Sequence, residues 1–212
     1  IATNGPIGET ISFAKALTLR AASGYRPVFS NGGITASTGS SGAQTIRVDG
    51  LEFHQSVVYL SQASTGSTTF LVTNNAFQGG AIALGTNVPG AGPVSFTVTG
   101  NTMENLFNPG ISVGSLTATF IGVIADNVVA MGAGSVYGIS VGPRVIADVF
   151  RNHVSGDARG IGVTGDADVR IVNNLIVGPL DTPGTGQDGV DILGVGVIAA
   201  LVANNTIARW DK

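Results

Sequence analysis

The sequence predicts an all-β fold, a parallel β-helix of about seven coils stacked one upon the next. Three observations support it: runs of β-branched residues that end in asparagine, a second series of strands bounded by glycine, and a common period for both. The repeat also contains no amphipathic stretch of about 10 residues or more, which argues against leucine-rich and βαβ solenoids. We therefore expect residues 1–212 to form one elongated domain.

Asparagines recur at one corner of each predicted coil. The runs that contain them read LVTNNAF, TVTGNTM, VIADNVV, VFRNHV, IVNNLIV and LVANNTI, and successive asparagines lie 26, 26, 25, 22 and 31 residues apart. Asparagine tolerates left-handed backbone geometry, and its amide can bond to equivalent amides one coil away. We expect a structural turn ladder without a role in binding or catalysis. Its members are Asn75, Asn101, Asn127, Asn152, Asn174 and Asn205.

A second series of short strands alternates with the first. Its members are GAIALG (80–85), GISVG (110–114 and 138–142), GIGVTG (160–165) and GVDILG (189–194). Glycine opens and closes each strand, and the apolar residues between point to one side at a period of two residues. Because both series share one period, each coil should contain at least two short strands that pair in parallel with their equivalents one coil away.

The chain before the first ladder asparagine carries the same pattern. Residues 8–29, GETISFAKALTLRAASGYRPVF, alternate apolar and polar residues as half-buried strands do. Gly50 stands 25 positions before Asn75, so the repeat begins before its first asparagine. Two Pro- and Gly-rich loops, residues 86–93 and 178–187, interrupt the minimal coil and should leave different corners, so they are not expected to form one cleft.

The NNxI and GNTx turns that alternate with GIxV strands resemble the repeats of the pectate-lyase-like superfamily of right-handed parallel β-helices. Residues 15–28, KALTLRAASGYRPV, are similar to a first coil in bacterial members, and the resemblance extends over about residues 9–207. It implies a right-handed coil and a bacterial protein that is secreted or exposed at the cell surface. It does not specify an activity, because the superfamily includes lyases, glycosidases, epimerases, phage tailspikes and adhesins.

The composition excludes several classes of protein. The net charge is -3 and the chain contains only two lysines, so there is no basic stripe for nucleic acid. The absence of cysteine excludes a disulfide scaffold and a thiolate metal site. The longest uncharged apolar run, residues 192–203, is about 12 residues long, whereas a transmembrane helix needs about 20.

The two ends of the chain carry expectations of their own. The chain begins at Ile1 without a methionine, which indicates that a leader has been removed or that this is part of a longer protein. It stops at residues 209–212, shortly after the last asparagine corner, without a helix or a polar cap. The end of an uncapped solenoid leaves backbone groups without hydrogen-bond partners and exposes the apolar core to water, so we expect further protein or another subunit there.

The residues before each asparagine predict an inner and an outer side. The residue three positions before each asparagine, such as Val72 or Val149, should point inward, and the residues on either side of it should point outward. Asp148 and Arg170 then lie on adjacent coils about 4.8 Å apart and should form a surface ion pair. The rest of the outer side is unusually apolar. It is either an interface, with a second copy of the chain as one candidate partner, or a surface that a loop covers.

The strands bounded by glycine carry the candidate ligand site. Tyr137, Arg159 and Asp188 should lie in one line on successive coils, with Asp191 beside them. Because a guanidinium pairs well with a carboxylate, this patch could bind the hydroxyl or uronate groups of a polysaccharide. The alternative is a solvated ion pair without a ligand.

Catalysis would need more than this patch. A lyase needs a base and a cation that neutralises the uronate, and a glycosidase needs two suitably spaced carboxyls. Asp188, Asp191 and Arg159 are the catalytic candidates. The Asp cluster typical of calcium-dependent pectate lyases and the paired Asp and Gly-His-Gly motifs of polygalacturonases are missing. The sequence therefore favours a structural or binding module, and a polysaccharide lyase or glycoside hydrolase is the alternative.

No cofactor and no metal site is expected. Residues 186–191, GQDGVD, match part of a calcium-binding nonapeptide in a single copy, so calcium is the one alternative left open. His54 and His153 lie about four coils apart and cannot share a metal ion.

Overall fold

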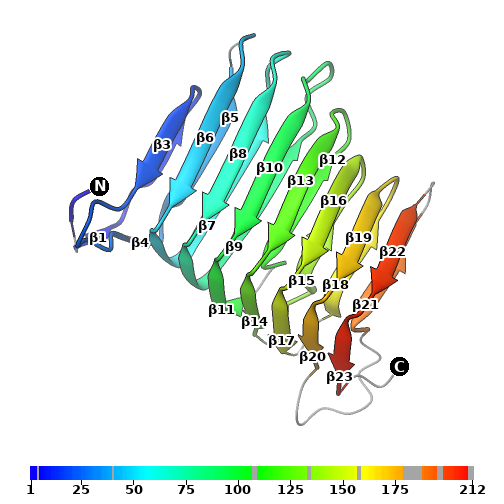
Figure 1. Cartoon of the computed structure of the whole chain (residues 1–212). Helices are drawn as coiled ribbons and strands as arrows, with labels where there is room; N and C mark the ends of the chain where they lie inside the picture. The colour runs from blue at the N-terminus through cyan, green and yellow to red at the C-terminus, as the bar shows by residue number, and fades with distance from the viewer. Residues whose placement is uncertain are drawn as a thin grey trace.

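The structure is a computed structural model that describes residues 1–3, 5–39, 41–106, 109–132, 135–156, 159–178, 188–194 and 198–209. Within these residues the chain contains strands and turns and no helix. It winds into a right-handed parallel β-solenoid of about seven turns, whose coils follow one another in sequence order (Figure 1). The predicted fold class is confirmed.

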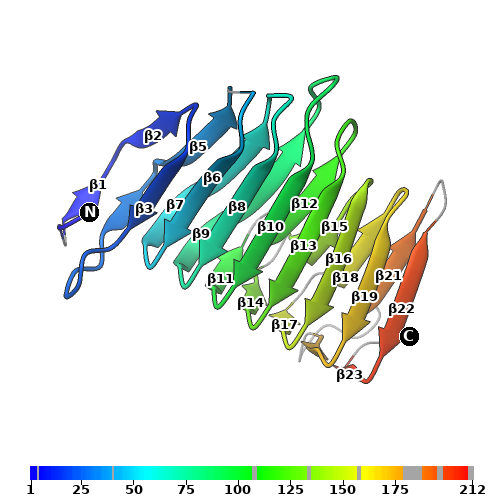
Figure 2. The ribbon, with the colours of Figure 1, turned by 45° about the horizontal axis from the view of Figure 1, so that its top comes forward.

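Each coil has three faces, and the strands of each face pair with those of the neighbouring coils (Figure 2). Face 1 is an eight-stranded parallel sheet that ends at the asparagine corner. In order along the solenoid its strands are β3 (Leu17–Arg20), β6 (Gln44–Asp49), β8 (Thr68–Thr73), β10 (Val94–Thr99), β13 (Phe120–Ala125), β16 (Val145–Phe150), β19 (Asp168–Val172) and β22 (Ala199–Ala203).

Faces 2 and 3 share a 15-stranded sheet, because β7 (Glu52–Gln62) and β9 (Ala76–Thr86) run through the corner between them. Face 2 begins directly after each asparagine. It contains the first residues of β7 and β9 with β1 (Pro6–Ile7), β4 (Val28–Ser30), β11 (Thr102–Leu106), β14 (Val128–Met131), β17 (His153–Gly156), β20 (Leu175–Val177) and β23 (Thr206–Ala208). Face 3 contains the remaining residues of β7 and β9 with β2 (Thr10–Phe13), β5 (Gly33–Thr38), β12 (Ile111–Ser115), β15 (Tyr137–Val141), β18 (Arg159–Thr164) and β21 (Val190–Leu193).

The six predicted asparagines stack at the corner between faces 1 and 2 as a continuous hydrogen-bonded ladder. Asn127 shows the pattern. Its Oδ1 accepts from the backbone N–H and the Nδ2 of Asn101, each at 3.0 Å. Its Nδ2 donates to the carbonyl of Val98 and to Asn152 Oδ1, each at 2.9 Å. Because Asn127 is fully buried, water cannot bond to the backbone groups at this corner, and the asparagine amide provides their hydrogen-bond partners instead.

The left-handed backbone conformation falls on the residue before each ladder asparagine. The expectation that the ladder asparagines themselves adopt it is wrong. The angle φ is 57° at Asp126, 53° at Arg151 and 67° at Gly100, the residues that precede Asn127, Asn152 and Asn101. The preceding residue makes the sharp turn, which leaves the ladder asparagine free to turn its amide into the corner.

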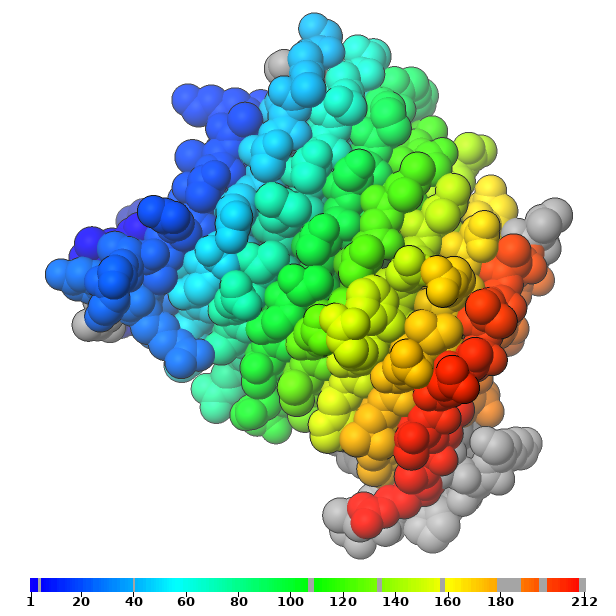
Figure 3. Space-filling view, in the orientation of Figure 1, coloured from blue at the N-terminus to red at the C-terminus, as the bar shows by residue number. Residues whose placement is uncertain are grey.

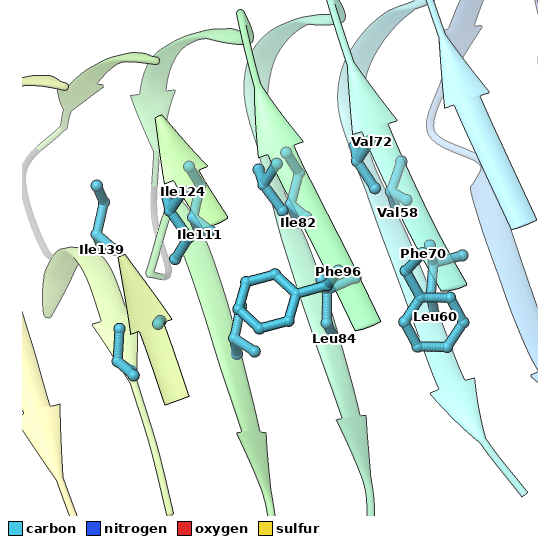
Figure 4. Close-up of a cluster of buried hydrophobic side chains, with 14 of the residues drawn as sticks. Val58, Leu60, Phe70, Val72, Ile82, Leu84, Phe96, Ile111, Ile124 and Ile139 are labelled. Atoms are coloured by element: carbon cyan, nitrogen blue, oxygen red, sulfur yellow. The ribbon is translucent and has the colours of Figure 1, made fainter. Parts of the chain in front are cut away.

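The core is a narrow apolar interior between the three faces. Figure 4 shows Val58, Leu60, Ile82 and Leu84 of face 3 meeting Phe70, Val72, Phe96 and Ile124 of face 1. Of the six residues predicted three positions before an asparagine, the five from Val72 to Ile171 are fully buried. Val202 in β22 is 42% exposed, because no described strand stacks on the far side of β22.

A second internal line of polar side chains, which the sequence analysis missed, follows the corner between faces 3 and 1. Gln62 is fully buried, and its Oε1 accepts from Thr38 Oγ1 and, at 2.8 Å, from Thr68 Oγ1. In the next coils Thr86 Oγ1 donates to the carbonyl of Gln62, and Ser115 Oγ to the carbonyl of Thr86 at 3.3 Å. These bonds tie four successive coils together at the corner from which residues 86–93 leave.

The outer side of face 1 is apolar and uncovered. Ile121, Ile146 and Leu201 are 50%, 44% and 51% exposed. Figure 3 shows this side as bands in sequence order, with no described segment lying across them. The alternative that a loop covers it is therefore wrong for the part of the chain that the structure describes. The predicted ion pair is confirmed, with 3.3 Å between Arg170 Nη1 and Asp148 Oδ1.

Candidate functional site

The candidate patch lies on the outer side of face 3, where β15, β18 and β21 begin. Glycines create its geometry. A Cβ at Gly138 would lie 2.3 Å from the core side chain of Val154, and the equivalent Gly160 is equally crowded. Because these glycines occupy inward positions, the residues just before them, Tyr137 and Arg159, turn outward. These two residues are paired in register on adjacent coils.

Tyr137, Arg159 and Asp191 form one cluster across three coils. Tyr137 OH donates to Asp191 Oδ2 at 2.9 Å, and Arg159 Nε lies 3.3 Å from the same oxygen. Arg159 Nη1 donates to Tyr137 OH at 3.3 Å, and the guanidinium carbon lies 5.4 Å from the centroid of the tyrosine ring. A Cβ at Gly162 would lie 2.3 Å from that ring. The absence of a side chain at Gly162 therefore lets the ring cross β18 and reach β21.

The acidic member of the cluster is buried, and the basic member is accessible. The Asp191 side chain is 8% exposed, whereas that of Arg159 is 38% exposed. Burial, followed by the hydrogen bond to Asp191, raises the pKa of Tyr137 above its ordinary value. Asp191 and Tyr137 therefore fix the guanidinium in place, and Arg159 is the member that a ligand can reach.

Asp188 is not a member of this cluster. Its backbone carbonyl accepts from the N–H of Gly160 at 3.1 Å, which places it beside the coil of Arg159 as the sequence predicted. Among the described residues, however, its side chain has no hydrogen-bond or ion-pair partner. The contacts of Arg159 run instead to Asp191. Sequence spacing could align these residues but could not give the direction of their side chains.

The cluster is suited to binding oxygen atoms. An arginine carries five N–H donors in a planar fork, and two of its nitrogens, Nε and Nη1, face Asp191 and Tyr137. The remaining donors are available to hydroxyl or carboxylate oxygens. The cluster is less suited to general base catalysis, because Asp191 already interacts with Tyr137 and Arg159 and the cluster contains no second carboxylate.

The described residues contain no group of three or more His, Asp and Glu side chains that could hold a metal ion. The calcium-like segment that ends at Asp191 begins at residue 186, outside the described residues, so it stays untested. His54 and His153 lie on face 2, four strand steps apart from β7 to β17. A search of the same described residues finds no helix with the length and apolar character needed to cross a membrane.

The sequence analysis missed a second polar surface, on face 2. A hollow of about 330 Å³ lies there over β7, β9 and β11, with Arg26, which precedes β4, at one end. The sequence contained a signal for it. Gln78 and Glu104 follow Asn75 and Asn101 by three positions, and His54 follows Leu51, which occupies the same corner one coil earlier, by the same interval. This row lies on the short strands that follow the asparagine, outside both series of strands that the repeat pattern marks most clearly.

Comparisons of the chain with protein-family models, with curated proteins and with solved structures found no match. The β-solenoid therefore rests on the structure itself, and the resemblance to the pectate-lyase-like superfamily stays a prediction. Function has to be argued from the geometry of the sites.

Proposed function

We propose that this chain is a secreted or surface-exposed β-solenoid module that binds polysaccharide on face 3, with Arg159 as the principal contact. One observation carries the proposal: the guanidinium is held by Asp191 and Tyr137, yet 38% of its side chain remains exposed. A side chain already fixed before binding loses little conformational entropy when a ligand arrives. Arg159 is therefore prepared to donate to a sugar.

The surroundings of Arg159 favour an extended polymer over a compact ligand. Ser112, Ser140 and Gly162 follow one another in register beside the cluster, so small side chains leave this part of face 3 flat. The same row continues to Tyr59, which is 44% exposed. Four strand spacings separate Tyr59 from the coil of Arg159, about 19 Å. An aromatic ring at one end and a guanidinium at the other suit a chain of several sugars.

Binding to polysaccharides, compared between two arginine variants, tests this proposal. Arg159→Ala should weaken the binding of polygalacturonate or of a neutral glucan by about tenfold or more in affinity electrophoresis, because a charge-assisted contact is lost. Arg170→Ala is the matched control, since Arg170 also pairs with an aspartate but lies on face 1. Equal binding by both variants, or no binding by the unmodified protein, would refute the proposal.

Polysaccharide lyase or glycoside hydrolase activity is the alternative at the same site. Because Asp191 is already engaged by Tyr137 and Arg159, we expect the protein to leave both polymers intact. The measurement is the release of unsaturated uronates or of reducing ends over a range of pH. Release that disappears in Asp191→Asn would establish the enzymatic alternative.

Self-association through face 1 is a second candidate function, favoured by the exposure of Ile121 and Ile146. A hollow of about 310 Å³ lies between them and the Asp148–Arg170 pair. Because that pair offers both signs of charge, two copies could meet face to face around a twofold axis. Face 1 spans roughly 650 Å² from its strand dimensions, slightly below the usual 800 Å² per partner, so we expect a weak dimer. Light scattering on the protein and on Ile146→Lys across a dilution series tests this, and a monomer throughout would refute it.

A further inference from the structure

The hollow on face 2 is built by the register of three neighbouring coils. Glu52, Ala76 and Thr102 are paired across β7, β9 and β11, and the next outward row along the same strands is His54, Gln78 and Glu104. Adjacent residues within a row are therefore about 4.8 Å apart. The small side chain of Ala76 lies between two longer ones, and it lines the hollow together with Gln78. The result is a shallow polar depression with side chains of different chemistry at its rim.

One end of the hollow is held in place by contacts of Glu52. Arg26 Nε lies 2.8 Å from Glu52 Oε2, and His54 Nε2 lies 2.6 Å from Glu52 Oε1. Both carboxylate oxygens of Glu52 therefore have a partner from the protein. The Glu52 side chain is only 26% exposed, so its two partners hold it in a defined position. At this end the charge of Glu52 is offset by that of Arg26.

The other end carries an uncompensated negative charge. Glu104 is exposed, and no ion-pair partner for it is found among the described residues. Gln78 lies between Glu104 and His54 in the same row, and its amide both donates and accepts hydrogen bonds. Along the hollow the chemistry therefore changes from the Arg26–Glu52 ion pair, through a neutral amide, to a carboxylate that has no ion-pair partner in the described part of the chain.

We propose that this hollow is a second ligand site, which binds an amino sugar. The ammonium group would pair with Glu104, and the ring hydroxyls would bond to Gln78, Thr102 and the Arg26–Glu52 pair. The volume of about 330 Å³ lies at the lower end of the range for small-molecule pockets, which fits a single sugar unit. The inference does not rest on polysaccharide binding by Arg159, because the two sites lie on different faces and have opposite charge preferences.

Calorimetric titration with three matched ligands tests the inference. Short oligomers of glucosamine should bind at about pH 6, where an amine of this class is protonated, and their N-acetylated equivalents should bind at least tenfold more weakly. A linear polyamine of equal charge should also bind more weakly, because it lacks the ring hydroxyls. Equal affinity for all three ligands, or no binding of the glucosamine oligomers, would overturn the proposal.

Variants assign the binding to this hollow. Glu104→Gln keeps the shape of the side chain and should lower affinity for the glucosamine oligomers about tenfold, because it removes the charge of an exposed carboxylate. Glu9→Gln removes one exposed carboxylate elsewhere and should bind like the unmodified protein. If Glu104→Gln and Glu9→Gln bind alike, Glu104 is not the ammonium partner and the proposal fails.

Discussion

Replacing Asn127 by alanine removes one rung from the middle of the asparagine ladder. The side chain makes four hydrogen bonds of 2.9–3.0 Å, all within a fully buried corner. Each such bond contributes about 1 kcal/mol net, and the backbone N–H of Asn101 would lose its acceptor in a place without water. We therefore expect Asn127→Ala to lower the free energy of unfolding by about 3–5 kcal/mol.

The assay is chemical denaturation followed by circular dichroism, with Asn74→Gly as the control. Asn74 is also a corner asparagine, but it occupies the left-handed position, with φ of 56°, and its Nδ2 bond to Asp49 is exposed. Glycine adopts that backbone conformation readily, so the control should lose less than about 1 kcal/mol. If Asn127→Ala loses no more free energy of unfolding than Asn74→Gly, the asparagine ladder does not stabilise the fold.

Three further predictions follow from the contacts of single side chains. Gly162→Ala should displace the Tyr137 ring, because the new Cβ would lie 2.3 Å from it. The variant should therefore weaken polysaccharide binding as Arg159→Ala does, and unchanged binding would contradict the described position of the ring. Tyr137 has a raised pKa in the folded chain, so its contribution to stability is complete below pH 10.0 and declines above it. Tyr137→Phe should reduce that decline in denaturation measurements between about pH 9 and 11, and an identical pH profile would contradict this. Arg151→Asn removes the hydrogen bonds that lower the pKa of Asp126, yet the denaturation midpoint should stay close to that of the unmodified protein, because the pair is exposed and asparagine suits the left-handed conformation. A midpoint lowered as far as that of Asn127→Ala would contradict this.

The sequence predicted the coil because its pattern is set by packing. Val72 and its equivalents have to face a narrow core, and each asparagine has to stack on the next, so both recur at a fixed interval. Face 2 was less visible because its strands are short and follow the asparagine directly. In β7 and β9 these residues also continue into face 3 as one unbroken strand. The position of the corner therefore cannot be predicted from the spacing of glycines alone.

The candidate site was predicted in part. Alignment of the strands bounded by glycine placed Tyr137, Arg159 and Asp191 on neighbouring coils, where the structure brings them into contact. It also placed Asp188 in the same line, but spacing alone could not show that the tyrosine ring crosses Gly162 to reach Asp191. That contact depends on the absence of a side chain at Gly162, over which the tyrosine ring passes, and on the Asp191 side chain that meets the tyrosine hydroxyl, which are properties of three-dimensional packing.

The most direct test of the central claim is to observe Arg159 while a polysaccharide fragment binds. Isotope-labelled protein would be titrated with oligogalacturonides and with neutral oligosaccharides, and the Nε–H signals of its arginines followed by nuclear magnetic resonance. We predict that the signal of Arg159 and the backbone amides of Ser112 and Ser140 shift together with one dissociation constant, while the signal of Arg170 stays unchanged. A titration in which Arg159 does not respond, or in which Arg170 responds equally, would contradict the assignment of face 3 as the binding surface.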